Sequence, residues 1–231
     1  VYTRFENTKN AGVRRTRAGA QNAAMTAIID YKAGNLTSVK LAFQAIDIKA
    51  EITDRPEKVL SAERLVFPGV GAAASSMKSL RELGLLPAIR EAVTRGVPFL
   101  GICLGTQVTL TRSEEDGGVD CADILPGTVR MFKPSCSFVK VPQMGWNNVN
   151  FKKQHPVFEK IENNSEFYFV HSYFPDPENA EHILATTDYA GINFASVIGK
   201  NNIVATQFHP EKSGRIGLRL LKNFAEWDGK C

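Results

Sequence analysis

A cysteine between two glycines is the first feature of the chain that could carry chemistry. Cys103 lies in "GICLG", residues 101–105, directly after an apolar run that begins at Val97. A G-x-C-x-G segment after a buried strand is the cysteine form of the nucleophile elbow, a sharp turn from strand to helix that exposes the side chain. Taken alone, a cysteine is more often a small buried apolar residue. The interpretation of Cys103 as a nucleophile therefore requires a second residue that can act as its base.

The turn itself would support a nucleophile. Gly101 and Gly105 have no Cβ, so neighbouring elements can approach closely. The start of the following helix favours a thiolate over a thiol at Cys103. The N–H of Leu104 lacks a helical acceptor and can face an oxyanion. Gln107, four residues after the cysteine, shares its helix face.

The candidate base is the histidine of "HPE", residues 209–211. Pro210 favours an extended backbone at His209, and in an extended segment residues i and i+2 face the same side. Glu211 could therefore hold one ring nitrogen of His209 and leave the other for Cys103, a nucleophile–base–orienter arrangement. A surface H-P-E turn is the alternative interpretation. The other histidines are rival bases without a carboxylate so placed: His155, His171 and His182.

A second glycine-rich loop would complete such a site. "FPGVG", residues 67–71, follows another apolar run, and Gly69 and Gly71 would let backbone N–H groups turn toward the thiol. An ordinary Gly/Pro turn is the alternative interpretation. In open α/β sheets, chemistry gathers at the carboxyl ends of the strands. The Cys103 turn, the His209 segment and the loop 67–71 each follow a predicted strand. This shared placement favours one common site.

The order of elements in the first half of the chain predicts a parallel sheet. Apolar runs predict strands at 26–30, 50–53, 64–71 and 97–102. Apolar positions at helical spacing predict one helix after Asn35, a candidate N-cap, and two more near 74–83 and 86–95. Strands that alternate with helices are typical of a parallel sheet covered on both faces.

After residue 120 the pattern is dominated by strands. Strand-like segments are found at 127–132, 147–151, 166–174, 182–189, 194–199 and 202–208. "IGKNN", residues 198–202, is typical of a hairpin turn, and an amphipathic helix is predicted from Ile216 to Trp227. The predicted fold class is α/β: a flavodoxin-like open, mostly parallel sheet with helices on both faces and added antiparallel strands in the C-terminal half.

Composition and charge exclude several classes of protein. The 231 residues carry a formal net charge of +4, but residues 1–24 hold five basic residues and one acidic residue, so the remainder has 23 of each. That balance gives no case for nucleic-acid binding. No window approaches the ~18 uninterrupted apolar residues of a membrane span. The four cysteines include no C-x-x-C pair, which argues against a disulfide framework or zinc site and favours the cytoplasm.

The basic segment at residues 1–24 shows no apolar periodicity. We expect a disordered extension, with Met25 as the natural start of the organised sequence. A targeting segment or a basic interaction arm is the alternative. Because no linker or repeat divides the rest, residues 25–231 are expected to form a single domain.

The segments "PGVG", "GICLGTQ" and "QFHPEKSG", in this order, resemble the class I glutamine amidotransferase family. Further segments are similar to the members of that family that are glutaminase subunits of imidazole glycerol phosphate synthase: "IIDYKAGNL" (28–36), "VPQMGWNNV" (141–149), "YFVHSY" (168–173) and "HPEKSG" (209–214). The resemblance covers residues 25–227. It implies the class I glutamine amidotransferase fold, glutamine hydrolysis by a Cys-His-Glu triad, and neither a cofactor nor a metal.

The resemblance also implies roles for single residues. Cys103 would attack the side-chain amide of glutamine, His209 would activate the thiol and protonate the departing ammonia, and Glu211 would orient His209. The residues that match oxyanion- and substrate-binding positions are Val70, Gly71, Leu104, Gln107, Ser172 and Tyr173. Those that match positions near the partner interface are Asn35, Gln143, Trp146 and Lys212. From the residues alone, a position in the hydrophobic core is as good an interpretation of Trp146 as a position at an interface.

A partner is implied because released ammonia is lost to protonation and solvent. The family's partner is a (β/α)8-barrel cyclase, held in a heterodimer, which uses the ammonia on a phosphoribulosyl-formimino-aminoimidazole-carboxamide ribotide. The products are imidazole glycerol phosphate and an aminoimidazole carboxamide ribotide, in histidine biosynthesis. The alternatives are a subunit that serves another synthase, a non-catalytic partner of the cyclase, and a redox-sensing or peptidase-like protein that uses Cys103.

The chain departs from the family pattern at positions close to the predicted site. Residues 72–74 are "AAA", so Ala73 stands where the family usually has a bulky aromatic. Thr106 replaces the usual methionine, and Gln143 replaces a frequent histidine. Residues 107–112 are rich in β-branched types for a helix. These departures leave the triad complete and affect the expected shape of the glutamine pocket and of the interface.

Overall fold

A computed structural model describes residues 25–32, 34–134 and 139–230. The extension expected at residues 1–24 lies outside these residues. The first strands are β1 (Thr26–Ile29), β2 (Ala50–Thr53), β3 (Arg64–Phe67) and β4 (Phe99–Ile102). The helices between and after them are α1 (Leu36–Gln44), α2 (Pro56–Ser61), α3 (Ala73–Glu82), α4 (Leu85–Thr94) and α5 (Leu104–Thr109). This alternation confirms the predicted α/β class.

The rest of the chain is built mainly of strands, as predicted. They are β5 (Arg112–Ser113), β6 (Val119–Asp120), β7 (Gly127–Met131), β8 (Gln143–Phe151), β9 (Ser165–His171), β10 (Tyr173–Pro177), β11 (Ile183–Tyr189), β12 (Ile192–Lys200) and β13 (Ile203–Thr206). Helix α6 (Gly214–Glu226) follows. Short 3-10 helices lie at η1 (Glu115–Gly117), η2 (Pro156–Phe158), η3 (Ala180–His182) and η4 (Pro210–Lys212).

Nine strands form the main sheet, in the order β2-β1-β3-β4-β13-β12-β11-β8-β9. The strands from β2 to β13 pair in parallel, and those from β13 to β9 pair in antiparallel. The hairpin predicted at residues 198–202 joins β12 to β13, with Lys200 opposite Ile203. The main sheet is therefore parallel on the side built from the first half of the chain and antiparallel on the other.

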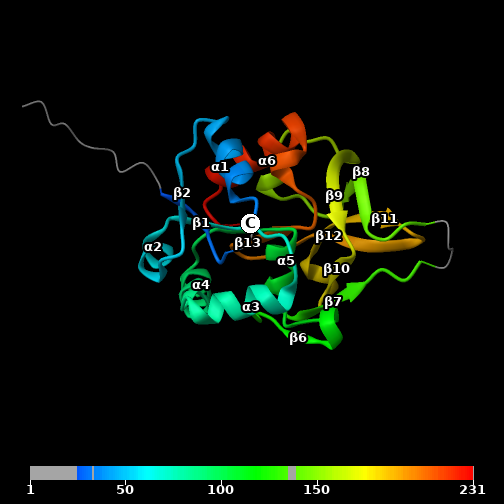
Figure 1. The fold of residues 1–231 in the computed structure, drawn as a ribbon. Helices are drawn as coiled ribbons and strands as arrows, with labels where there is room; N and C mark the ends of the chain where they lie inside the picture. The colour runs from blue at the N-terminus through cyan, green and yellow to red at the C-terminus, as the bar shows by residue number, and fades with distance from the viewer. Residues whose placement is uncertain (1–24, 33, 135–138, 231) are drawn as a thin grey trace, which may run out of the picture.

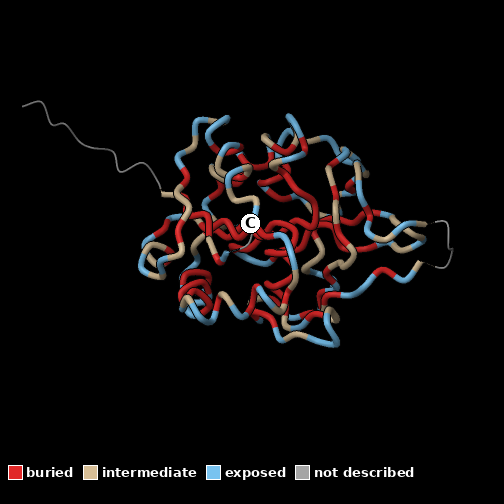
Figure 2. The backbone as a smooth tube through the Cα atoms, in the orientation of Figure 1, coloured by how far each residue is buried: buried red, intermediate tan, exposed pale blue. Residues whose placement is uncertain are grey.

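Helices cover both faces of the sheet, as Figure 1 shows: α1 and α6 lie on one face, and α3 and α4 on the other. Alternate residues of β1 divide between these layers. Ile28 belongs to the core beneath α1 and α6, whereas Ala27 and Ile29 belong to the core beneath α3 and α4. Both faces of the strands are thus apolar, and Figure 2 shows the resulting buried band through the middle of the molecule.

A second sheet was not predicted. Strands β5, β6, β7 and β10 form a separate four-stranded sheet in the order β10-β7-β5-β6. The segment 166–174, predicted as one strand, breaks at Ser172, so that β9 pairs with β8 in the main sheet and β10 pairs with β7 in the small one. The second half therefore adds antiparallel strands to the main sheet, as predicted, but β5, β6, β7 and β10 lie outside that sheet. The break places Ser172 between the two sheets.

Two local features differ from what the sequence indicated. Helix α2 was not predicted, because its six residues are too short to show a periodic pattern. Asn35 precedes α1 as expected, but its side chain caps no backbone N–H and its backbone is left-handed, with φ 74°. Its Oδ1 instead accepts a hydrogen bond from the Ser38 hydroxyl at 2.6 Å.

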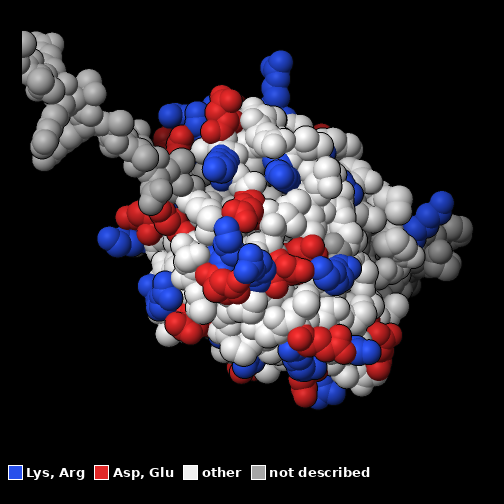
Figure 3. Space-filling view, turned by 60° about the vertical axis from the view of Figure 1, so that its left-hand side comes forward, with Lys and Arg blue, Asp and Glu red and all other residues white. Residues whose placement is uncertain are grey.

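The charged side chains are mixed in sign on the face shown in Figure 3, where Lys and Arg lie among Asp and Glu. Several of them form exposed ion pairs, such as Lys32 with Asp54 at 2.8 Å. This agrees with the formal neutrality of the sequence after residue 24. Within the described residues, no helix combines the length and the apolar character needed to cross a membrane.

Candidate active site

Three loops that carry candidate residues lie at one end of the main sheet. β4 pairs in parallel with β3 on one side and with β13 on the other, with Gly101 opposite both Phe67 and Ala205. The carboxyl ends of these three strands are therefore adjacent. They lead into the loop 68–71, the Cys103 turn and the His209 segment, respectively.

Cys103 occupies a strained turn between β4 and α5. Its backbone has φ 54° and ψ −109°, a combination that residues with a side chain rarely adopt. Its N–H donates to the carbonyl of Thr206 at 2.8 Å, which ties the turn to β13. A Cβ on Gly105 would lie 1.6 Å from the carbonyl oxygen of Phe67, and one on Gly101 would lie 2.8 Å from a side chain of β13. The glycines therefore provide the close approach that the sequence analysis expected.

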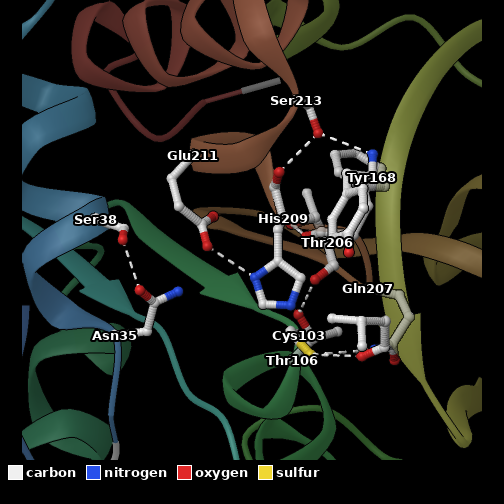
Figure 4. A network of polar contacts seen from close by, with 12 residues as sticks. Asn35, Ser38, Cys103, Thr106, Tyr168, Thr206, Gln207, His209, Glu211 and Ser213 are labelled. Atoms are coloured by element: carbon white, nitrogen blue, oxygen red, sulfur yellow. Dashed lines mark hydrogen bonds and ion pairs between the residues drawn. The ribbon is translucent and has the colours of Figure 1, made fainter. Parts of the chain in front are cut away.

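His209 and Glu211 form a buried pair beside this turn. Nδ1 of His209 lies 2.8 Å from Oε1 of Glu211, and the two side chains are 2% and 1% exposed. Figure 4 shows the second ring nitrogen, Nε2, turned toward Cys103. His209 is extended before Pro210, as expected. The reason given for the pairing was wrong, however, because residues 210–212 form the 3-10 helix η4, so the contact crosses a tight turn.

The charge state of His209 depends on its two partners. Burial of the ring disfavours imidazolium, but the Cys103 thiol and the Glu211 carboxylate outweigh that effect and raise the pKa of His209 to about 10. Nε2 makes no hydrogen bond of ordinary geometry with any described residue, but it lies close enough to the Cys103 thiol for hydrogen bonding and charge to raise the pKa of the ring. A cationic imidazole at this position favours a thiolate at Cys103.

The backbone of His209 is anchored to β9. Its N–H donates to the carbonyl of Tyr168 at 2.9 Å. The hydroxyl of Ser213 donates to the His209 carbonyl at 2.6 Å and accepts from the Tyr168 N–H at 3.0 Å, as Figure 4 shows. Ser213 is itself buried, so these bonds fix the direction in which the imidazole leaves the chain.

The rival histidines are held in other ways. The ring of His171 lies near the site, but its Nδ1 lies 2.7 Å from the carbonyl oxygen of Tyr173 and its Nε2 lies 3.1 Å from Oε1 of Gln143, so its one N–H is directed to one of these two oxygens. Burial lowers the pKa of His171 to about 4, so the ring is neutral. Burial also lowers the pKa of His155 to about 4 and that of His182. Neither of these two lines the cavity beside Cys103.

A cavity of about 290 Å³ opens onto the Cys103 thiol. Its lining includes eight residues predicted for the site: Val70, Gly71, Cys103, Leu104, Gln107, Ser172, Tyr173 and His209. Glu211 lies behind His209 and does not line it. The other lining residues are Glu115, Val170 and His171. Substrate-sized space, the thiol and the candidate base therefore meet in one place.

Glu115 was missed by the sequence analysis. It lies in η1, and its Oε2 accepts a hydrogen bond from the N–H of Ala73, the first residue of α3, at 2.6 Å. This contact joins residues 42 positions apart, so no local pattern could have revealed it. It places a carboxylate, favoured at a helix N-terminus, in the wall of the cavity.

The positions that depart from the family pattern lie at or beside the site. Thr106 is fully buried, and its hydroxyl donates to the carbonyl of Thr206 at 2.6 Å. Ala73 supplies the N–H that binds Glu115. Gln143 lies beside His171. Each substituted position therefore contacts an element of the site or its supports.

The residues predicted near a partner interface do not share one environment. Trp146 is 55% exposed and Lys212 is exposed, whereas Asn35 is half-buried and Gln143 is buried. The core alternative for Trp146 is therefore wrong. Its ring makes an edge contact with Tyr168, the residue that anchors His209. Met144, on the same strand, is 67% exposed.

A larger hollow of about 810 Å³ lies elsewhere, between Phe151, His155, Phe158 and Lys230. It contains neither the thiol nor the His209–Glu211 pair. Among the described residues, no three His, Cys, Asp or Glu side chains are grouped so that they could hold a metal ion. The smaller cavity at Cys103 is therefore the candidate active site.

The comparisons with known proteins agree with this fold. The family model of class I glutamine amidotransferases matches residues 24–227. A solved structure titled PurLQS from Thermotoga maritima superposes with a TM-score of 0.70 at 15% identity, over 88% of this chain and 98% of that one. A solved glutamine amidotransferase gives 0.64 at 19% identity, over 87% and 97%. The chain is a class I glutamine amidotransferase.

Relatives found by sequence identify the group within this class to which the chain belongs. The chain is 46% identical over 200 residues to the imidazole glycerol phosphate synthase subunit HisH of Dehalococcoides mccartyi, covering 87% of this chain and 96% of that one. It is 48% identical over 202 residues to HisH of Chlorobium chlorochromatii, covering 87% and 100%. Within the class, the chain therefore belongs to the HisH family of imidazole glycerol phosphate synthase subunits.

Proposed function

We propose that this chain hydrolyses glutamine to glutamate and ammonia with Cys103, His209 and Glu211, and that it passes the ammonia to a cyclase subunit in histidine biosynthesis. The observation that carries the proposal is the convergence at the end of the main sheet. A strained cysteine opens onto a cavity of about 290 Å³ beside a buried His–Glu pair. This is the arrangement that nucleophilic catalysis requires.

The reaction proceeds through a thioester. The proton of the Cys103 thiol already lies on Nε2 of His209, whose pKa is raised, and the thiolate attacks the carboxamide carbon of glutamine to form a C–S bond and an oxyanion. Collapse of the oxyanion breaks the C–N bond, and His209 returns the proton to the departing ammonia. Water, deprotonated by His209, then attacks the thioester. Breakage of the C–S bond releases glutamate and restores Cys103.

The oxyanion would be held by backbone N–H groups of Leu104 and of the Val70–Gly71 loop. Leu104 is the first residue of α5, so its N–H has no acceptor inside the helix. Gly71 has φ 105°, which frees the loop to turn its amides toward the thiol. Both loops line the cavity. Such donors stabilise the tetrahedral intermediates more than the substrate.

The rest of the cavity suits an amino acid. Glu115 would bind the α-ammonium group of glutamine by charge. Gln107, Ser172 and Tyr173 would hold its amino and carboxylate groups. Because a cavity of about 290 Å³ is small, it favours a free amino acid over a peptide, which argues against a peptidase.

The partner would be a (β/α)8-barrel cyclase that covers this end of the sheet and forms a heterodimer with the chain. Its products would be imidazole glycerol phosphate and an aminoimidazole carboxamide ribotide. Val70 at the cavity mouth and the pair Trp146 and Met144 on β8 are exposed apolar residues. Exposed apolar groups close to a site are typical of a docking surface.

Trp146 is the candidate anchor of that surface, since exposed tryptophans often dominate binding. We expect Trp146→Ala to weaken cyclase binding by about 2 kcal/mol, roughly thirtyfold in Kd. Leu41→Ala, a similarly exposed apolar change on α1, should leave Kd within about twofold. Titration calorimetry with the purified cyclase measures both, and an unchanged Kd for Trp146→Ala would remove it from the interface.

The decisive experiment is a glutaminase assay with and without a barrel cyclase and a ligand of the cyclase site. Cys103→Ala should abolish ammonia release yet preserve cyclase binding. Cys121→Ala is the matched control, because burial raises the pKa of that thiol to about 11 and keeps it unreactive. Ammonia release that survives in Cys103→Ala would disprove the triad.

A labelling experiment separates the remaining alternatives. A glutamine-analogue electrophile should label Cys103, and excess glutamine should abolish the labelling. Labelling that glutamine does not prevent would favour a redox-sensing or peptidase-like protein. Full cyclase binding without any glutaminase activity would favour a non-catalytic partner.

A further inference from the structure

Gln207 is a fully buried polar residue in the segment that joins β13 to His209. Its Nε2 donates a hydrogen bond to Sγ of Cys103 at 3.7 Å, a contact that Figure 4 shows. Its Oε1 accepts a hydrogen bond from Nε2 of Gln107 at 3.1 Å. Burial of an amide is costly unless it is hydrogen-bonded, so the position of Gln207 depends on these two contacts.

The contact with sulfur has a chemical consequence. Cys103 is only 7% exposed, so little water is available to solvate a thiolate. His209, directly before η4, provides one polar group beside the sulfur, and the Gln207 amide provides a second N–H. A hydrogen bond to the charged form of a group favours that form. The Gln207 amide N–H is therefore placed where a hydrogen bond to sulfur would favour the thiolate.

The contact with Gln107 orients a residue of the cavity wall. The two amide hydrogens of Gln107 are directed to the carbonyl of Tyr173 at 3.0 Å and to Oε1 of Gln207 at 3.1 Å. Only the amide oxygen of Gln107 is then left for a ligand. Without Gln207, the amide could rotate and present either end.

We propose that Gln207 is a further catalytic residue, whose amide N–H stabilises the Cys103 thiolate while its amide oxygen fixes the orientation of Gln107. The first role stands on geometry alone, and the second rests on the proposed function. The two contacts of Gln207 join residues about a hundred positions apart in the chain. They connect Cys103, the cavity wall at Gln107 and the segment that carries His209.

The experiment measures the thiolate directly and needs no glutamine. The rate of alkylation of Cys103 by iodoacetamide is followed from pH 5 to pH 9 by peptide mass spectrometry, which separates Cys103 from the other cysteines. The variants are Gln207→Met, which keeps the volume but removes donor and acceptor, and Gln207→Glu, which keeps the acceptor for Gln107. Ser196→Ala is the control for a buried polar change beside this segment, since it leaves the backbone bond from Gln207 N–H to the Ser196 carbonyl intact and removes a buried hydroxyl that has no hydrogen-bond partner among the described residues.

Other ionisable groups act on the same sulfur and are unchanged in every variant. His209 and Glu211 lie on one side, Tyr31 interacts with the thiol from the end of β1, and Glu115 and His171 line the cavity. Differences between the variants therefore report on Gln207. Thermal unfolding is measured alongside, so that a misfolded variant is recognised.

We expect the half-maximal pH of alkylation to rise by about one unit in Gln207→Met, which slows the reaction about tenfold at pH values below it. Gln207→Glu should raise it at least as far, because it replaces a donor by a negative charge. Ser196→Ala should match the wild type. If Gln207→Met misfolds, Gln207→Glu decides the first role. A wild-type profile in a folded Gln207→Met or Gln207→Glu protein would overturn it.

The KM for glutamine tests the second role. It should rise in Gln207→Met and stay near the wild-type value in Gln207→Glu, which still accepts from Gln107. An equal KM in wild type and Gln207→Met would overturn this role. If none of the proteins hydrolyses glutamine, the proposed function fails, while the alkylation profile still decides the role of Gln207 at the thiol.

Discussion

At the scale of single residues, the backbone of Cys103 determines what its thiol can do. A φ of 54° with a ψ of −109° costs on the order of 1–3 kcal/mol for a residue with a side chain. The bond to Thr206 and the close packing of Gly101 and Gly105 hold that conformation. The same turn directs Sγ at the cavity and at His209. In the proposed function, strain and reactivity would thus have a common origin in the turn.

In the proposed function Glu211 acts through His209, and its charge is the property to test. Glu211→Gln keeps the shape of the side chain but removes the charge that stabilises imidazolium, so the pKa of His209 should fall. We expect kcat for glutamine hydrolysis in the cyclase complex to drop by about 10²–10⁴-fold, with KM within about twofold. Steady-state ammonia release across pH 6–9 measures both constants.

The control for this change is Glu226→Gln, which removes an exposed carboxylate on α6. It should leave kcat within about twofold, since a surface ion pair contributes little. If Glu211→Gln kept kcat within threefold of the wild type, the carboxylate would be a structural support of η4 and not an orienter of the base.

Candidate site residues could be predicted from the sequence where a local pattern accompanies a reactive side chain. Cys103 is marked by its glycines and His209 by its proline and carboxylate. Glu115 and Gln207 carry no such mark, because what they do depends on partners 42 and 104 positions away in the chain. A carboxylate or an amide is ordinary in any sequence, and only the folded arrangement gives it a role.

At the scale of elements, β3, β4 and β13 form the frame of the site. Their parallel pairing sets three loops side by side, and α5 packs directly against β3 through Gly105. The position of Leu104 N–H depends on that packing distance. A small displacement of α5 would therefore alter both stability and oxyanion binding.

Gly105→Ala tests this close approach. The added Cβ would lie 1.6 Å from the Phe67 carbonyl oxygen, which belongs to the backbone and cannot rotate away. We expect a loss of about 3 kcal/mol or more in the free energy of unfolding, together with a lower kcat. Urea unfolding and the glutaminase assay provide the two measurements.

Gly34→Ala is the matched control for Gly105→Ala. A Cβ added at Gly34 would meet only a Val70 methyl group at 3.5 Å, which is an ordinary contact distance. Its effect on stability should stay within about 1 kcal/mol. A Gly105→Ala protein as stable as Gly34→Ala would mean that α5 moves away from β3 at little cost, and the packing argument would then be wrong.

Elements were predictable where the periodicity was unambiguous. The parallel half alternates apolar strands with amphipathic helices such as α4, whose buried face includes Leu86, Ile89 and Val93. The small sheet was not predictable, because residues 166–174 show one continuous strand pattern across Ser172. The change of sheet at that residue is set by tertiary pairing with β8 and β7.

At the scale of the whole molecule, buried histidines couple stability to pH in opposite directions. Burial lowers the pKa of His155 and of His171 to about 4, so each stabilises the fold fully above pH 6.5 and less as the pH falls toward 4. His209, with its pKa raised to about 10, stabilises the fold below pH 6.5 and less as the pH rises toward 10. His155 and His171 therefore act on the acid side of the pH dependence, and His209 acts on the alkaline side.

His155 allows the acid side of this balance to be measured away from the catalytic residues. Its Nδ1 accepts a hydrogen bond from the N–H of Val157 at 3.2 Å, and its ring packs edge-on against Trp227. Protonation would remove that acceptor and place a charge in an apolar contact. We expect the wild type to lose about 1–2 kcal/mol of unfolding free energy through this group between pH 7 and pH 5.

His155→Asn keeps an acceptor near the position of Nδ1 but does not titrate. Urea unfolding at pH 7 and pH 5 should therefore show a smaller acid loss in this variant than in the wild type. His182→Asn is the control, and it should flatten the pH dependence less, because His182 is more exposed than His155. If the wild type and His155→Asn lost equal stability between the two pH values, His155 would be protonated in the folded protein, and the acid side of the pH dependence would have to come from His171.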